Sequence, residues 1–123
     1  MRQYALNSAM FVEVPEAIRQ AAAAGARALL VTGAGRGFCS GADLVGGNGF
    51  EGTRSEEARL RANREGFKKV VSLVRALNEA PMPVVCAING VAAGGGIGIA
   101  LAGDVLLMAR SARFVLTFVP RLG

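Results

Sequence analysis

The sequence of 123 residues contains no histidine and no tryptophan, and it has a single tyrosine. Without histidine, the chain cannot assemble a Ser-His-Asp or Cys-His catalytic group, and it cannot bind a metal through imidazole nitrogens. The scarcity of tryptophan and tyrosine gives little support to base stacking, so a nucleic-acid partner is not expected. The absence of histidine is the firmest limit that the composition places on the chemistry.

Cysteine is also scarce. Cys39 and Cys86 lie in different motifs, without the close spacing of metal ligands, so we expect free thiols and no metal site. The N-terminus has neither a charged segment followed by an apolar one nor a cleavage site for secretion. Free thiols are typical of a reducing compartment, and a cytoplasmic location is therefore expected.

Charge is modest, and hydrophobic residues make up 52% of the chain, which excludes a disordered protein and allows one domain. The net charge of +5 suits either an anionic partner or a basic surface. Seven of the fourteen basic residues lie between Arg54 and Arg75, on a predicted helix. Solvation of that helix face is favoured over contact with phosphates.

An uncharged, glycine-rich stretch dominates the second half of the chain. Val84–Ile88 is typical of a buried strand, Asn89-Gly90 of a turn, and the glycines at 94–96 begin a second apolar run that predicts a short helix. The first N–H groups of such a helix have no partner within it and would suit an anion or a developing oxyanion. The glycine run alone only suggests such a site.

Two alternatives apply to this stretch. The absence of charge from Val84 to Gly103 resembles a membrane span, although six glycines, one asparagine and the preceding Pro81 and Pro83 oppose that interpretation. The other alternative is a core helix whose glycines serve packing and bind no ligand.

A second glycine-rich segment, Gly33–Leu44, follows a predicted strand at Ala28–Thr32 that we expect to be covered on both faces of a parallel sheet. Its third glycine comes one residue too early for a dinucleotide fingerprint, and no Gly-Lys-Ser/Thr ends it as in a P-loop. Open α/β sheets place ligand sites at such positions, but a plain surface turn explains the segment equally well.

The other elements are predicted from periodicity and from helix ends. A helix begins after Asn7 or Ser8 and stops at Gly25; Pro15 lies either in the first turn of a shorter version or inside a longer one, where it costs about 3 kcal/mol.

Thr53 and Glu56 fit a capping box for a long helix that Pro81 and Pro83 end. Asp104–Ala109 and the segment from Phe114 to Phe118 are expected to be extended. We find no internal repeat in the sequence.

Three stretches taken in order resemble the enoyl-CoA hydratase/isomerase (crotonase) family. They are Ala5–Asn7, Gly37–Leu44, and Ile88–Gly96 followed by Gly103-Asp104. The resemblance implies an α/β fold, a spiral of β-β-α units. Residues 1–123 would form a single crotonase-like core fragment, incomplete at both ends and without the family's C-terminal helical part.

The resemblance also implies a reaction. An acyl-CoA thioester would lie between the two glycine-rich segments, and the backbone N–H groups of Ser40 and Gly95 would form an oxyanion hole for its carbonyl oxygen. Asp43 resembles a structural carboxylate of the loop. The implied substrate-binding positions are Ala5, Phe38, Ser40, Gly41, Ala42, Asp43, Leu44, Gly94 and Gly95.

The chain departs from the family's hydratases, which carry glutamates where Gly98 and Phe118 stand here. Many isomerase-type relatives carry a carboxylate further along, at positions after Gly123. The favoured function is therefore an acyl-CoA isomerase; the alternatives are a non-catalytic acyl-CoA-binding or assembly protein and, less favoured, a hydratase. The expected partner is an acyl-CoA, with no cofactor besides the coenzyme A of the substrate. The full-length form is expected to be a homo-oligomer, trimer or hexamer, that contacts no membrane.

Overall fold

The computed structural model describes residues 5–42 and 55–116 of the chain. In chain order its elements are β1 (Ala5–Leu6), α1 (Met10–Ala23), β2 (Leu29–Thr32), β3 (Gly37–Cys39), β4 (Gly41–Ala42), α2 (Glu56–Asn78), β5 (Val84–Ile88), β6 (Val91–Ala93), α3 (Gly95–Ala100), β7 (Val105–Met108) and β8 (Arg113–Val115). The described strands form two parallel three-stranded sheets, in the orders β2-β5-β7 and β3-β6-β8, and β1 pairs with β4.

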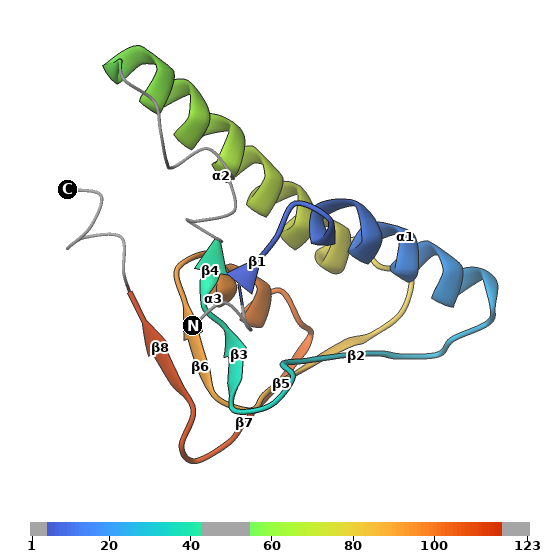
Figure 1. Ribbon diagram of the computed structural model, residues 1–123. Coiled ribbons are helices and arrows are strands. Elements are labelled where there is room, and N and C mark those ends of the chain that lie inside the picture. Colours follow the sequence, from blue (N-terminus) through green and yellow to red (C-terminus); the bar gives the residue numbers. More distant parts are fainter. Residues whose placement is uncertain (1–4, 43–54, 117–123) are drawn as a thin grey trace.

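This strand order contains a structural repeat. A strand of the first sheet is followed by a strand of the second three times, as β2–β3, β5–β6 and β7–β8, with α2 and α3 between the successive pairs (Figure 1). Each pair thus adds one parallel strand to each sheet, which is the spiral of β-β-α units expected from the resemblance. The units begin at unequal intervals, at Leu29, Val84 and Val105, so the sequence shows no fixed period.

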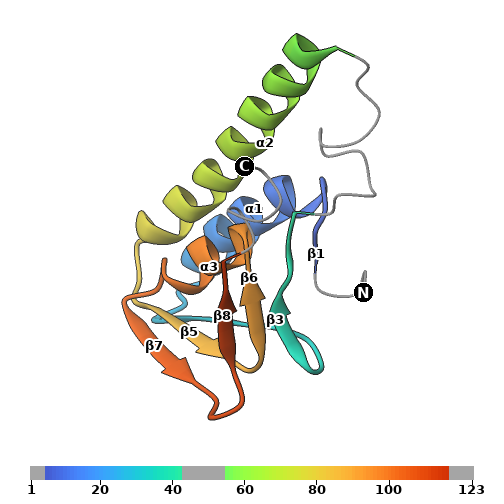
Figure 2. The ribbon, with the colours of Figure 1, turned by 90° about the vertical axis from the view of Figure 1, so that its left-hand side faces the viewer.

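The helices lie together over one side of the sheets, and the N-terminal half of α2 projects beyond them (Figures 1 and 2). Between the helices and the sheets lies one hydrophobic core. Its most deeply buried large side chains are Leu6, Leu73, Leu77, Val84, Cys86 and Ile88. No helix in residues 5–42 or 55–116 is both long enough and apolar enough to cross a membrane.

The first helix ends where the sequence predicts, but its N-cap residue is Ala9 and not Asn7 or Ser8. The Asn7 Oδ1 accepts a hydrogen bond from the Met10 N–H at 3.0 Å. At the other end Gly25 has a φ of +81°, and the Gly25 and Ala26 N–H groups bond to the carbonyls of Ala22 and Ala21, a Schellman arrangement. Of the two versions that the sequence leaves open, the structure has the longer one, with Pro15 inside α1.

The capping box predicted at Thr53 and Glu56 is wrong. The N-cap of α2 is Ser55, whose hydroxyl accepts a hydrogen bond from the Ala58 N–H, while Thr53 lies outside the described residues. Position 58 carries no carboxylate, so the reciprocal half of a capping box is missing. The helix ends at Asn78, before Pro81, as predicted.

The first sheet is less covered than predicted. Leu29 and Val31 of β2 face the core, but Leu30 is 65% exposed, so within the described residues this strand is buried on one face only. The four residues of β7 are all exposed. β2 and β7 are also the two edges of the sheet, each pairing with β5 alone among the described strands.

The glycine-rich stretch after Val84 contains one element more than the sequence indicates. The predicted strand, turn and helix are present as β5, Asn89-Gly90 and α3, but a second short strand, β6, lies between the turn and the helix. β6 belongs to the other sheet, where it pairs with β3 and β8. The turn at Asn89-Gly90 therefore carries the chain from one sheet to the next.

Candidate active site

The two glycine-rich segments meet where β4 follows β3 and where α3 follows β6. Gly41 of β4 has a φ of +91°, which side chains other than hydrogen disfavour. A Cβ atom on Gly41 would lie 2.9 Å from the Ala93 carbonyl oxygen and 3.4 Å from the Gly95 nitrogen. The backbones of the two segments are therefore in direct contact at this point, as Figure 1 shows for β4 and α3.

The first turn of α3 also lies against β3. A Cβ atom on Gly96 would lie 2.5 Å from the Cys39 carbonyl oxygen and 2.9 Å from the Cys39 Sγ, distances too short for any side chain. Glycine at this position therefore permits the close approach of the helix to the strand. Ser40 follows Cys39 directly and Gly95 precedes Gly96, so the same contact brings their backbones close together.

Ser40 and Gly95 carry the two N–H groups that the resemblance assigns to an oxyanion hole. Ser40 is exposed between β3 and β4, and Gly95 is the first residue of α3. Neither N–H has a hydrogen-bond partner among residues 5–42 and 55–116. Because α3 has only six residues, such a site would depend on individual N–H groups more than on a long helix dipole.

Apolar side chains of α2 and β1 surround the start of α3. A Cβ atom on Gly95 would contact Val70 at 3.3 Å and Leu6 at 3.7 Å, and one on Gly98 would contact Val74 at 3.3 Å. Gly95 and Gly98 thus form the face of α3 that packs on α2. Donors near apolar walls interact more strongly with a developing charge than donors in open water do.

Cys39 is a packing residue at this site. Burial raises the pKa of its thiol above the ordinary value of 9.0, against a smaller opposite effect of the Gly41 N–H, which bonds to the sulfur. The pKa of the Cys86 thiol is raised for the same reason, opposed by a bond from the Gly103 N–H. Protonated, buried thiols are poor nucleophiles, and both cysteines are free.

Comparison with known proteins identifies the family. A family model described as "Enoyl-CoA hydratase/isomerase" matches residues 2–123. The chain belongs to the enoyl-CoA hydratase/isomerase family.

Two curated relatives have different activities in their names. The chain is 42% identical over 118 residues to "1,2-epoxyphenylacetyl-CoA isomerase" of Escherichia coli, covering 95% of this chain and 44% of that protein. It is 44% identical over 119 residues to "Probable enoyl-CoA hydratase" of Rhodobacter capsulatus, covering 97% and 42%. The chain thus spans less than half the length of these relatives, and the names do not distinguish an isomerase from a hydratase.

The solved structures confirm the fold. The crystal structure of an enoyl-CoA hydratase from Bacillus anthracis matches with a TM-score of 0.80 at 34% identity, covering 97% of this chain and 44% of that one. The α/β fold is therefore crotonase-like, and the chain covers part of it.

The structure brings most of the family's implied binding positions together. Ala5 of β1 pairs with Gly41 of β4, and Phe38 lies buried in β3. The backbone of Ala42 continues β4. Asp43 and Leu44 fall outside the described residues.

This chain differs from the family's hydratases at the two positions where the resemblance implies acid/base glutamates. Gly98 carries no side chain and faces Val74 of α2, so it can neither donate nor accept a proton. Phe118 lies outside the described residues. Within residues 5–42 and 55–116, no three His, Cys, Asp or Glu side chains are grouped closely enough to hold a metal ion.

Asn89 joins the two glycine-rich segments, which the sequence does not reveal because Asn89-Gly90 is typical of an ordinary turn. Its side-chain amide bonds to the backbone of the segment Gly33–Gly37, more than fifty residues earlier. Only a weak sequence signal indicates this link. Asn89 is a polar residue directly after the buried strand β5, and the glycine-rich turn directly follows β2, the strand that pairs with β5.

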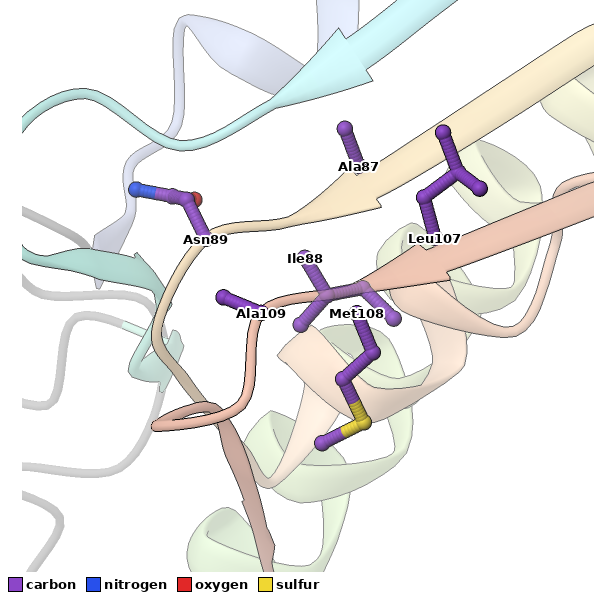
Figure 3. Close-up of a pocket in the computed structure, with 6 residues that line it drawn as sticks. All are labelled: Ala87, Ile88, Asn89, Leu107, Met108 and Ala109. Carbon is purple, nitrogen blue, oxygen red and sulfur yellow. The ribbon is translucent and has the colours of Figure 1, made fainter.

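A shallow apolar depression lies at the Asn89 turn, and neither Ser40 nor Gly95 is among the residues that line it (Figure 3). Its volume is about 270 Å³, and it is lined by Ala87, Ile88, Asn89, Leu107, Met108 and Ala109. In Figure 3 the Asn89 amide points away from Leu107 and Met108, toward the segment that follows β2. The depression thus has almost no polar group directed into it, and we assign it no part in the chemistry.

Proposed function

We propose that this chain contains the carbonyl-binding half of an acyl-CoA isomerase. The observation that carries the proposal is the direct contact between the Gly41 backbone and the Gly94–Gly95 backbone, where the N–H groups of Ser40 and Gly95 have no partner among the described residues. Two backbone donors at one place are what a thioester oxygen requires when it becomes an enolate oxygen.

In the proposed reaction, a base removes a proton from the carbon next to the thioester carbonyl. The electron pair of the broken C–H bond moves into the carbonyl, and the negative charge on oxygen is stabilised by the Ser40 and Gly95 N–H groups. Return of a proton to a different carbon of the conjugated system completes the isomerisation. The reaction needs no cofactor, since coenzyme A enters as part of the substrate. The base would be a carboxylate that isomerase-type relatives carry later in the chain.

A hydratase is disfavoured by the surroundings of α3. Hydration needs an acid/base group that holds water, and the atoms that a Cβ on Gly95 or Gly98 would meet first belong to the apolar Val70, Val74 and Leu6. The same apolar surroundings support a second candidate, a non-catalytic protein that binds acyl-CoA. The two candidates differ in one property, turnover of a bound thioester.

The test measures binding and turnover separately. Calorimetry with acetyl-CoA and with a longer enoyl-CoA measures binding to the chain as it stands. Absorbance of the conjugated thioester then follows isomerisation of a 3-enoyl-CoA and hydration of crotonyl-CoA, by this chain and by the whole reading frame that contains it. We expect binding in both proteins, and isomerisation without hydration in the longer one.

Gly95→Pro removes one of the two donors. Gly95 is the first residue of α3, where proline is best tolerated, and the expected loss in kcat of the longer protein is about 10² to 10³. Gly98→Ala is the control, because it alters the same helix and keeps both N–H groups. Binding without any turnover in the longer protein would favour the non-catalytic candidate, and no binding of any CoA ester by folded protein would refute both.

A further inference from the structure

The side chain of Asn89 joins the two glycine-rich segments. Its Oδ1 accepts a hydrogen bond from the Gly33 N–H at 3.0 Å. Its Nδ2 donates to the carbonyl oxygens of Gly35 at 2.9 Å and of Gly37 at 3.3 Å. One amide group thus bonds to three backbone groups of the turn between β2 and β3.

The two turns also lie close together through their backbones. A Cβ atom on Gly90 would lie 2.1 Å from the Arg36 carbonyl oxygen of the first turn, and within that turn one on Gly33 would lie 2.2 Å from the Gly37 carbonyl oxygen. Neither glycine leaves room for a side chain that could replace the link. The Asn89 amide therefore joins the two turns by three hydrogen bonds at a place where neither glycine could carry a side chain to replace it.

Each turn leads directly to one of the two candidate donors. The turn at Gly33–Gly37 continues through β3 to Ser40, and Asn89 is followed by β6 and then by Gly95. The pairing of β3 with β6 is irregular, because its register shifts between Gly37 and Cys39. Bonds at the start of this short, glycine-containing ladder therefore contribute to where its end lies.

We propose that Asn89 is a positioning residue for the two-donor site. By fixing the start of β3 against the start of β6, its amide sets the position of the Ser40 N–H relative to the Gly95 N–H. The consequence for catalysis rests on the proposed function. The positioning of the two N–H groups does not, and can be measured in the ligand-free protein.

Asparagine is chemically suited to this role. Its amide offers an acceptor and two donor hydrogens, and it uses both kinds of group here. Aspartate would keep the acceptor for the Gly33 N–H but would place a negative charge beside the Gly35 and Gly37 oxygens. Alanine would remove all three bonds.

A matched control exists one residue before Gly33. The Thr32 Oγ1 donates to the Ala87 carbonyl oxygen at 2.8 Å, so it also joins the strand before the first turn to the strand before the second. Thr32→Val removes that bond at nearly constant volume and leaves the turn intact. It therefore measures the effect of losing a hydrogen bond between the same two strands without losing the Asn89 link.

The experiment compares the wild-type chain with Asn89→Ala, Asn89→Asp and Thr32→Val. Amide ¹H and ¹⁵N chemical shifts of Ser40 and Gly95 are measured in the free proteins. The ¹³C shift of the thioester carbonyl of bound acetyl-CoA is measured at saturation, where affinity no longer matters. Both Asn89 variants should move the Ser40 and Gly95 signals well beyond the change in Thr32→Val, and should lose more of the downfield carbonyl shift.

The outcomes separate the two proposals. If both Asn89 variants leave the Ser40 and Gly95 signals within the range of Thr32→Val, Asn89 has no positioning role and the inference is overturned. If the wild-type chain binds no acetyl-CoA, the proposed function fails, while displaced amide signals would still support positioning. If Asn89→Ala does not fold, the same criteria apply to Asn89→Asp, which keeps one of the three bonds.

Discussion

Replacing Gly96 by alanine tests directly how α3 is seated on β3. The added Cβ would lie 2.5 Å from the Cys39 carbonyl oxygen, 2.7 Å from its Cβ and 2.9 Å from its Sγ. The nearest of these atoms belongs to the backbone, so no rotation of a side chain relieves the overlap. Either α3 or β3 must move, and overpacking of this kind typically costs about 1–3 kcal/mol.

Gly98→Ala is the internal reference for that cost. Both substitutions replace glycine in the same helix and gain the same helix propensity of about 1 kcal/mol. At position 98, however, the new Cβ meets the Val74 Cγ2 at 3.3 Å, a side-chain atom that can shift by a few tenths of an ångström. The difference in unfolding free energy between the two variants therefore isolates the backbone overlap, and we expect Gly96→Ala to be the less stable by about 1–3 kcal/mol.

Urea unfolding followed by circular dichroism suits the measurement, because the chain has no tryptophan for fluorescence. The slope of the free energy against urea should be equal in the two variants if both unfold from the same native fold. Equal stability of Gly96→Ala and Gly98→Ala would refute the close contact between α3 and β3. The inferred closeness of the Ser40 and Gly95 backbones would then lose its structural basis.

Three further predictions follow from other parts of the molecule. Burial raises the pKa of the Cys39 and Cys86 thiols, so their contribution to stability should be complete below the ordinary pKa of 9.0 and should be lost as the pH rises above it. Unfolding of Cys39→Ala and of the wild type at several pH values measures this contribution for Cys39. A contribution that grows with pH would contradict the prediction. The exposed apolar edge strands β2 and β7 should make the chain self-associate. The double variant Leu30→Lys, Leu107→Lys should lower the fraction of associated protein measured by sedimentation. A wild-type chain that stays monomeric would show that these edges do not cause association. Crotonyl-CoA should not be hydrated measurably by this chain, since Gly98 supplies no acid or base, and rapid loss of the conjugated absorbance would mean that another residue does.

The sequence predicts the ends of elements better than their number. Gly25, Pro81 and Pro83 act locally, through backbone conformation or a missing N–H, and the helices end where these residues place the ends. β6 was missed because Val91–Ala93 is short and runs without a polar break into the apolar helix. The Ser55 cap was missed because Thr53 also satisfies the capping pattern, and only the observed helix start at Glu56 chooses between them.

The candidate site depends on contacts that no local pattern contains. Gly96 faces Cys39, and Asn89 bonds to Gly33, across more than fifty residues of sequence in each case. Single-sequence reasoning could identify the two glycine-rich segments as unusual, but only the resemblance to a family placed them side by side. Tertiary contacts, which the structure shows and the sequence does not, explain why glycines and Asn89 occupy these positions.

The most direct test of the two-donor site is a titration of the ¹⁵N-labelled chain with crotonyl-CoA, using free coenzyme A as the reference. Coenzyme A shares every group of the ligand except the acyl thioester, so the difference between the two titrations reports contacts to the carbonyl. Hydrogen bonds to that oxygen should move the Ser40 and Gly95 amide protons downfield with crotonyl-CoA and not with coenzyme A. Binding of crotonyl-CoA that leaves both amide signals where coenzyme A leaves them would contradict the account.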